Sequence, residues 1–281
     1  MNGIHLHMPE AEYHAHPALS STGARRLLES PAKFRYAQTH PEKPKAAFDL
    51  GTAVHTKVLG TGDTAVAYPP EHLTPSGNVS TKAATVEWAA EQRAAGRTPI
   101  SPEQMHEVDA MAEAVLAHPM ARVLLEQDGS PEASVFATDP DTNVDMRARF
   151  DYLPAGQNTS IAVDLKSARD ASPEGFAKAA ASHGYHVQRA WYDDTYRFAG
   201  APIELDAFVF VVVEVDAPHL VGVYKLNSEF EEIGHRRARR ARHLYRHGLD
   251  TGEWPGYSPA IQSLMAPFWL VAEAAEQEVA A

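Results

Sequence analysis

The chain has 281 residues, of which 44% are hydrophobic and 22% are charged, a balance that is typical of a globular protein and excludes wholesale disorder. It contains no cysteine, which excludes disulfides, thiolate zinc sites, cysteine nucleophiles and iron–sulfur clusters; any metal would be a hard ion held by oxygen and imidazole, such as magnesium or manganese. The net charge of −12 disfavours nucleic acid, so a phosphate backbone could be bound only where cations are concentrated.

The sequence predicts no segment for a membrane. It has no run of 18 apolar residues, and its first residues lack both the basic and the apolar part of a secretion signal. We therefore expect a cytoplasmic protein without membrane contact. The length fits one large α/β domain, and we predict a single domain over 1–281.

The first part of the chain, 1–130, is predicted to be mostly helical. Proline and glycine without periodicity predict a long mobile loop over 61–80. The expected helices cover 17–38, capped by Ser20 or Ser21 and interrupted at Pro31; 46–60; 81–95; and 101–126, the last two being separated at Gly96 and Pro99.

From about residue 132 the period of the hydrophobic pattern changes from 3.6 to 2, which predicts a sheet core over 131–226. Residues 227–281 are predicted to form C-terminal helices. The expected strands are 144–153, 161–166, 206–215 and 219–226, and the expected helices are 172–182, 184–199, an arginine-rich helix at 228–248 and a short helix within 258–280. The order of elements predicts an α/β fold with a central sheet flanked by helices.

Two acidic residues are expected to meet in this sheet. About seven residues that include Pro154 and Gly156 join the strands 144–153 and 161–166, so the strands should form an antiparallel hairpin. Asp151 then lies opposite residue 163 or 164, within about 4.5–5.5 Å of Asp164 or one diagonal away. Lys166 lies two residues further along the same face.

Two carboxylates this close repel each other unless a cation lies between them. A divalent ion would remove the repulsion, and it could also neutralise a phosphodiester and lower the pKa of an attacking water. In this arrangement Asp151 and Asp164 would hold the ion with the carbonyl of Leu165, and Lys166 would face the water and the scissile phosphate. An ordinary salt bridge on a solvated strand face is the alternative explanation of the same residues.

The pattern Asp151, then Asp164-Leu165-Lys166, resembles the D…(D/E)-x-K core of the PD-(D/E)XK nuclease superfamily. Further stretches resemble its RecB-like and RecE-like (exodeoxyribonuclease VIII, phage-type) branch. These are LSSTGARRLLESPAKFRY at 19–36, LGTAVH at 50–55, GYHVQRAWY at 184–192 and Pro218 after Glu214-Val-Asp. Together they imply a restriction-endonuclease-like core, a mixed sheet flanked by helices, with a helical N-terminal portion.

The resemblance also implies roles for single residues. His55, Asp151 and Asp164 would be metal ligands and Lys166 the catalytic lysine, with Mg²⁺ or Mn²⁺ as cofactor. Glu132 matches an acidic residue that some members place just before the first core strand. Gln188 and Tyr192 would line the DNA channel, although a buried helix stripe would give the same spacing.

The cations leave two interpretations open. Arg147 and Arg149 share the polar face of Asp151 and would either bind DNA or buffer the carboxylates. The arginines at 236–246 would either bind phosphates or pair with acidic neighbours on a solvated helix.

The resemblance implies an Mg-dependent exodeoxyribonuclease that acts from the ends of double-stranded DNA and resects it for recombination. In such families the enzyme works with a single-strand annealing recombinase and often forms a homo-oligomeric ring. The alternatives are a RecB-like endonuclease or flap nuclease, and a catalytically silent module that binds DNA ends.

Overall fold

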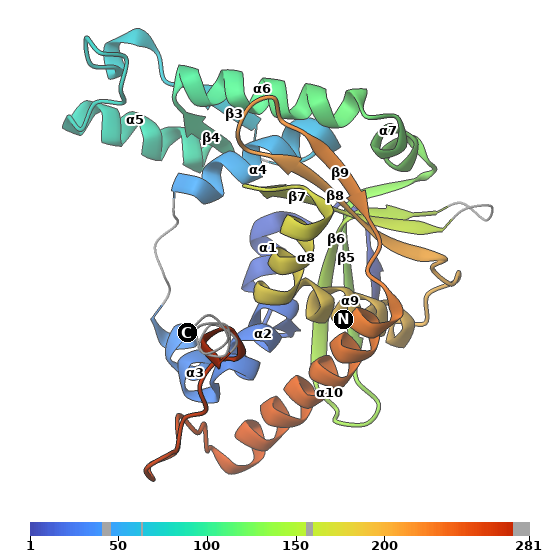
Figure 1. Cartoon of the computed structure of the whole chain (residues 1–281). Helices are drawn as coiled ribbons and strands as arrows, with labels where there is room; N and C mark the ends of the chain where they lie inside the picture. The colour runs from blue at the N-terminus through green and yellow to red at the C-terminus, as the bar shows by residue number, and fades with distance from the viewer. Residues whose placement is uncertain (41–45, 63, 156–159, 272–281) are drawn as a thin grey trace, which may run out of the picture.

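The structure is a computed structural model that describes residues 1–40, 46–62, 64–155 and 160–271 (Figure 1). The strands are β1 (Gly3–His5), β2 (Leu19–Ser20), β3 (Thr64–Ala67), β4 (Arg97–Ile100), β5 (Gly129–Thr138), β6 (Asp145–Pro154), β7 (Ile161–Ala168), β8 (Ala207–Glu214) and β9 (Val221–Tyr224). The α-helices are α1 (Glu10–Ala15), α2 (Ser21–Glu29), α3 (Pro31–Thr39), α4 (Ala46–Leu59), α5 (Ala83–Ala94), α6 (Pro102–Ala117), α7 (Pro119–Glu126), α8 (Pro173–Ser182), α9 (Tyr185–Phe198) and α10 (Ser228–Thr251).

The main sheet has seven strands within the described residues and is mixed. Its order is β1-β5-β6-β7-β8-β9, with the two-residue strand β2 pairing in parallel with β6. Strands β5, β6 and β7 are antiparallel neighbours, β7 and β8 are parallel, and β9 returns antiparallel to β8. This arrangement confirms the predicted mixed sheet and the predicted hairpin between β6 and β7.

Helices cover both faces of this sheet (Figure 1). Residues of α2, α8, α9 and α10 bury one face, where Trp191 is fully buried, and residues of α4, α6 and α7 bury the other, where Met111 is fully buried. Strand β7 serves both layers, since Ala162 belongs to the first core and Val163 and Leu165 to the second. Alternation along the strand therefore turns Asp164 toward the α9 layer.

Several helix predictions are confirmed. The Ser20 side chain caps α2 by accepting a hydrogen bond from the Gly23 amide at 3.2 Å, and Pro31 begins a separate helix, α3. The predicted helix 101–126 is wrong in one respect, because the chain breaks at His118 and Pro119 into α6 and α7. Proline lacks the amide hydrogen that would continue α6, and it fits the first turn of α7.

The predicted long mobile loop over 61–80 contains regular secondary structure, while its mobility stays a prediction. Strand β3 lies in it and pairs in parallel with β4, which occupies the predicted break at Gly96 and Pro99. A 3₁₀ turn (Pro70–His72) follows, and the ring of Tyr68 packs on that of Trp88 at 4.9 Å. The prolines and glycines that suggested a loop lie outside β3 (TAVA), and Pro99 is tolerated in β4 because both strands of a two-stranded sheet are edge strands.

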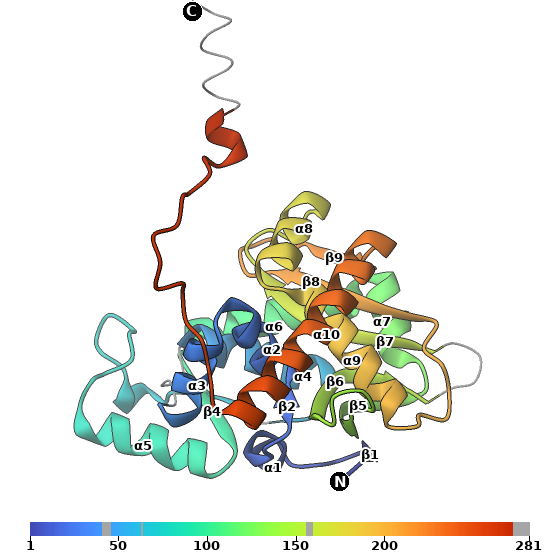
Figure 2. The same cartoon turned by 90° about the horizontal axis from the view of Figure 1, so that it is seen from below.

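The predicted helix within 258–280 is also wrong for most of its described part. Residues 252–267 contain no helix, and helix is found only at 268–271, while 272–281 lie outside the described residues. Pro259 and Pro267 interrupt any helical run there. Figure 2 shows this segment leaving the body of the protein beyond α10. The prediction of one domain over 1–281 stays a prediction.

Within the part of the chain that the structure describes, no helix is both long enough and apolar enough to cross a membrane.

Candidate active site

A cavity of about 790 Å³ opens where β6 and β7 separate. The described pairing of these strands is the single pair Tyr152 and Val163, and the same register places Asp151 beside Asp164. Beyond that pair, the Leu165 amide donates a 2.7 Å hydrogen bond to Oδ2 of Asp151 instead of to a strand partner. The Asp151 side chain thus takes the place of a backbone hydrogen bond between β6 and β7, and the gap between these strands lies at the bottom of the cavity.

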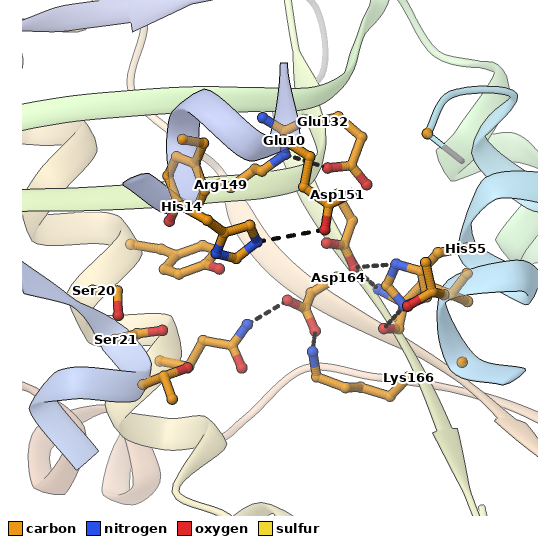
Figure 3. Close-up of a pocket in the computed structure, with 18 of the residues that line it drawn as sticks. Glu10, His14, Ser20, Ser21, His55, Glu132, Arg149, Asp151, Asp164 and Lys166 are labelled. Atoms are coloured by element: carbon orange, nitrogen blue, oxygen red, sulfur yellow. Dashed lines mark hydrogen bonds and ion pairs between the residues drawn. The ribbon is translucent and has the colours of Figure 1, made fainter. Parts of the chain in front are cut away.

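His55 reaches the same gap from α4, on the opposite side of the sheet from α9. Its Nε2 donates a 2.8 Å hydrogen bond to the carbonyl oxygen of Leu165, so both the amide and the carbonyl of this residue are held by side chains. A ring that donates from Nε2 leaves Nδ1 with a lone pair. Nδ1 faces Oδ2 of Asp151 at 3.6 Å, so two electron-rich atoms converge (Figure 3).

Glu132 completes a group suited to a metal. One ligand atom each from His55, Glu132 and Asp151 lies within 4.8 Å of the others. Glu132 lies inside β5, three residues after its start, rather than before the first core strand as its motif implied, and it has a φ of +53°. Two carboxylates and a neutral imidazole with converging lone pairs fit a divalent cation, and this donor set suits magnesium or manganese.

Asp164 lies next to this group, and its two carboxylate oxygens contact other side chains. It is buried, forms an ion pair with Lys166 and accepts a 2.6 Å hydrogen bond from the amide of Gln188. Gln188 comes from α9, so the two helix layers meet through the gap in the sheet: α4 provides His55 and α9 provides Gln188. Gln188, which was predicted to line a DNA channel, does line the cavity, and its amide nitrogen also orients Asp164; contact with DNA stays a prediction.

Burial and charge set the protonation of the site. Burial raises the pKa of Asp151 well above its usual value, and the negative charge of Asp164 raises it further. Burial lowers the pKa of His55, as does the charge of Lys166, which keeps the ring neutral and able to act as a ligand. Burial opposes the charged form of Lys166, but Asp164 and Asp151 outweigh it, so the pKa is raised and the ammonium stays protonated.

The two arginines of β6 line the cavity but are already engaged. Arg147 donates to the carbonyl of Tyr13 and stacks over its ring at 4.8 Å. Arg149 donates to the carbonyl of Met8 at 3.0 Å and forms an ion pair with Glu132 at 2.5 Å. Of the two predicted roles, these contacts favour buffering of the carboxylates.

The aromatic residues of α9 divide between core and cavity. Tyr192 borders the cavity but is only 8% exposed, and its ring packs at 5.0 Å from that of Phe150. Tyr185 is more open, and the ammonium of Lys166 lies 5.2 Å from its ring centre. The helix stripe is thus mainly core at Tyr192, while Tyr185 contacts the predicted catalytic lysine.

Sequence reasoning missed the residues of α1. Glu10, Tyr13 and His14 form one wall of the cavity, and His14 Nε2 lies 3.5 Å from a carboxylate oxygen of Glu10 (Figure 3). This contact lowers the pKa of Glu10 although burial opposes the shift. The helix has six residues, too few for a hydrophobic period, but the local density of Glu, Tyr and His in EAEYHA was a signal that could have been used.

The arginines of helix α10 differ in their surroundings, so no single one of the two predicted interpretations applies to all of them. Arg242 is buried and pairs with Asp139 at 3.1 Å and Asp194 at 2.8 Å, so it is a structural residue. Arg239 and Arg240 are exposed. Phosphate binding by these exposed arginines stays a prediction.

A mixed sheet flanked by helices, with paired acids and a lysine at a strand separation, defines a protein of the PD-(D/E)XK nuclease class. The family described as a PDDEXK-like domain of unknown function (DUF3799) matches residues 20–267, and the chain belongs to this family. The predicted superfamily is therefore confirmed.

Two solved structures are similar to this chain, and the first of them agrees on the fold. The crystal structure of a predicted exonuclease from Eubacterium rectale has a TM-score of 0.60 and 12% identity, over 96% of this chain and 99% of its own. A second structure, of the protein SSO0001, has a TM-score of 0.35 and 12% identity over 83% of this chain and 81% of its own. No curated protein matches the sequence.

Proposed function

We propose that the protein is a divalent-metal-dependent deoxyribonuclease that hydrolyses phosphodiester bonds from the ends of double-stranded DNA. One observation carries the proposal: Nδ1 of His55 and Oδ2 of Asp151 lie 3.6 Å apart, beside Glu132 and the Asp164–Lys166 pair. The family and the fold support the same chemistry.

The charge of the cavity supports a phosphate substrate only when a metal is bound. The lining has four acidic residues, Glu10, Glu132, Asp151 and Asp164, and four basic ones, Arg25, Arg147, Arg149 and Lys166, so it is formally neutral. A divalent ion would give it a positive charge in a chain whose net charge is −12.

His55, Glu132, Asp151 and the carbonyl of Leu165 would hold the ion, with Asp164 as a further ligand from the neighbouring strand position. The bound ion would supply Lewis acidity to the phosphate and to the attacking water. Lys166, kept protonated by the two aspartates, would stabilise the negative charge that develops on the phosphate oxygens. Gln188 would keep Asp164 in place, and Arg149 would limit the repulsion between Glu132 and Asp151.

Action from DNA ends, resection for recombination and a place in the RecE-like, phage-type branch rest on the sequence motifs and on the name of the Eubacterium rectale protein. The use of Mg²⁺ rather than Mn²⁺, a single-strand annealing recombinase as partner, a homo-oligomeric ring and a cytoplasmic location stay predictions.

The experiment is digestion of end-labelled linear duplex with Mg²⁺ beside a covalently closed circle of the same sequence. We expect release of nucleotides from the linear DNA, none with a chelator, and none from Lys166→Ala. The exposed residue Lys225 provides a matched control, and Lys225→Ala should keep full activity.

Each other outcome selects an alternative. Cutting of the closed circle would indicate the RecB-like endonuclease or flap nuclease. Binding of DNA ends without metal-dependent release of nucleotides, by protein that is folded, would indicate the catalytically silent module.

A further inference from the structure

The arginines of α10 concentrate positive charge in an acidic protein. Six of the chain's 25 lysines and arginines lie within eleven consecutive residues of this helix, although the net charge of the chain is −12. Contacts within the protein engage three of the six. Arg242 is buried between two aspartates, and Arg246 forms an ion pair with Asp250. Arg237 donates a 3.3 Å hydrogen bond to Nε2 of His186, and the other three, Arg236, Arg239 and Arg240, are exposed.

The three exposed arginines and His243 share one face of the helix, because they are spaced by three or four residues. We call Arg236, Arg239, Arg240 and His243 the α10 stripe. Arg236 has a partner, Glu232 at 3.7 Å, but both side chains are at least 70% exposed and such a pair is weak. In the part of the chain that the structure describes, the side chains of the other three form neither a hydrogen bond nor an ion pair. The stripe therefore has positive charge available for an outside partner.

The stripe is separate from the active site. The inner side of α10 packs against α9, since Ala238 and Ala241 belong to the same core as Trp191. The four side chains of the stripe do not line the active-site cavity, and together with Glu232 and His235 they border another open hollow of about 680 Å³. Figure 2 shows α10 lying across the face of the body that is turned to the viewer.

The chemistry of the stripe fits the phosphodiester backbone of a nucleic acid. The guanidinium group of arginine presents a planar fork of donors that matches the oxygens of a phosphate. An acidic protein can hold such a polyanion only where its cations are concentrated, and α10 provides that concentration.

Two features favour duplex DNA over a single strand. The stripe extends for about 10 Å along the helix, and over this length a duplex presents about six negative charges and a single strand about three. Surfaces that hold single strands also stack the bases on aromatic side chains. The two aromatic residues of α10, Phe230 and Tyr245, instead pack against other rings of the protein.

We propose that the α10 stripe is a second DNA-binding surface, which holds duplex DNA by its phosphates outside the active site. The proposal rests on the proposed function for the identity of the ligand, but it needs neither metal nor cleavage. Phosphate contacts carry no sequence information, so the stripe should hold any duplex and keep it close to the active site between cuts.

The test is the fluorescence anisotropy of a labelled duplex at several salt concentrations, with chelator present to prevent metal-dependent cleavage. Arg239→Gln with Arg240→Gln removes two positive charges from the stripe. The matched control, Arg122→Gln with Lys178→Gln, removes two from exposed residues of α7 and α8, so both double variants change the net charge from −12 to −14. Circular dichroism checks that each variant is folded.

The expected effect follows from counterion release. Two lost phosphate contacts should lower the slope of log K against log salt by about 1.8, which is roughly a 60-fold loss of affinity at 0.1 M salt relative to 1 M. We expect this loss in the stripe variant and wild-type affinity in the control. The same loss should appear when the stripe change is added to Lys166→Ala, because that residue belongs to the active site.

The absence of cysteine allows a test of the position of the DNA. His243→Cys places a single thiol in the stripe, and Val123→Cys places one on α7, at a residue that is 65% exposed. Duplex DNA should slow the reaction of a maleimide with the thiol at 243 and leave the reaction at 123 unchanged.

Three results would overturn the proposal. The first is a wild-type protein that does not bind duplex in chelator, and the second is a stripe variant with the affinity of the control. The third is tighter binding of a single strand or of polyglutamate than of duplex, which would indicate a single-strand surface or an acidic protein partner. If any of these occurs while magnesium-dependent digestion persists, the second surface is refuted and the nuclease is not.

Discussion

The replacement of Asp151 by Asn separates the charge of this residue from its hydrogen bond. The Asn side-chain oxygen can still accept the amide of Leu165, which the carboxylate binds at 2.7 Å, so the local backbone should be kept. What is lost is the carboxylate that would bind the ion beside Nδ1 of His55, because an amide cannot become negatively charged. We expect Asp151→Asn to abolish metal binding and leave the fold intact.

The size of the effect follows from linkage and from chain length. A ligand at a hundred times its Kd stabilises the folded state by about 2.7 kcal/mol. For a chain of 281 residues, an unfolding entropy of roughly 2.1 cal/mol/K per residue gives about 0.6 kcal/mol/K, so saturation should raise Tm by about 4–5 °C. The rise should be absent in Asp151→Asn.

The raised pKa of Asp151 determines how stability depends on pH without metal. The folded chain holds a proton on this carboxyl that the unfolded chain releases above its usual value of 3.8. The stability that this proton provides is therefore complete below 3.8 and is lost as pH rises through the raised pKa. Without metal, Asp151→Asn should be more stable than the wild type at neutral pH, and the difference should shrink as pH falls toward 4.

The measurement is thermal unfolding by circular dichroism, with chelator and with increasing Mg²⁺ or Mn²⁺. Asp145→Asn is the matched control, since Asp145 is an exposed acid on the same strand and its contact with the Thr138 hydroxyl can be made by an amide oxygen. A metal-dependent rise of Tm in Asp151→Asn equal to that of the wild type would refute the assignment. So would the absence of any rise in the wild type.

Three further substitutions test the surroundings of the site and the packing of the helices. Gln188→Leu removes a 2.6 Å hydrogen bond to the buried carboxylate of Asp164. It should lower kcat about ten- to hundredfold and keep the metal-dependent rise of Tm. An unchanged kcat would exclude a positioning role for Gln188. Arg242→Met leaves the buried carboxylates of Asp139 and Asp194 without their guanidinium partner. It should lower the free energy of unfolding, measured in urea, by about 3–5 kcal/mol, whereas the control Arg240→Met, at an exposed position, should lower it by less than about 0.5 kcal/mol. Similar losses for both variants would contradict the buried network. Gly234→Ala would stabilise an isolated helix, but in α10 its methyl carbon would lie 2.2 Å from the carbonyl oxygen of His186 in α9. The free energy of unfolding should therefore fall by about 1–3 kcal/mol. A gain would show that α9 and α10 can move apart at little cost.

The central hairpin could be predicted because its information is local. Alternation along 144–153 and a short turn fix which residues share a face, and the observed pair Tyr152 and Val163 has the register that brings Asp151 beside Asp164. His55 could be assigned to the site only through the resemblance, because no local pattern links residues that are 110 positions apart in the sequence, as His55 and Leu165 are.

The parts that were missed depend on tertiary contacts. Helix α1 has six residues, and it is held by Arg147 and Arg149, which bind the carbonyls of Tyr13 and Met8. The spacing of the arginines in α10 could not show that Arg242 alone among them would be buried between two acids, because both acids come from other elements. Strands β3 and β4 are four residues each, too short for a period to be recognised.

The double role of Leu165 limits how this protein can lose activity. Its amide and carbonyl depend on Asp151 and His55, so removal of either side chain leaves a polar backbone group unsatisfied inside the sheet. An inactive descendant that still folds would need amide side chains at 151 and 55, which replace the hydrogen bonds without replacing the chemistry. Alanine at either position should weaken the scaffold as well as the catalyst.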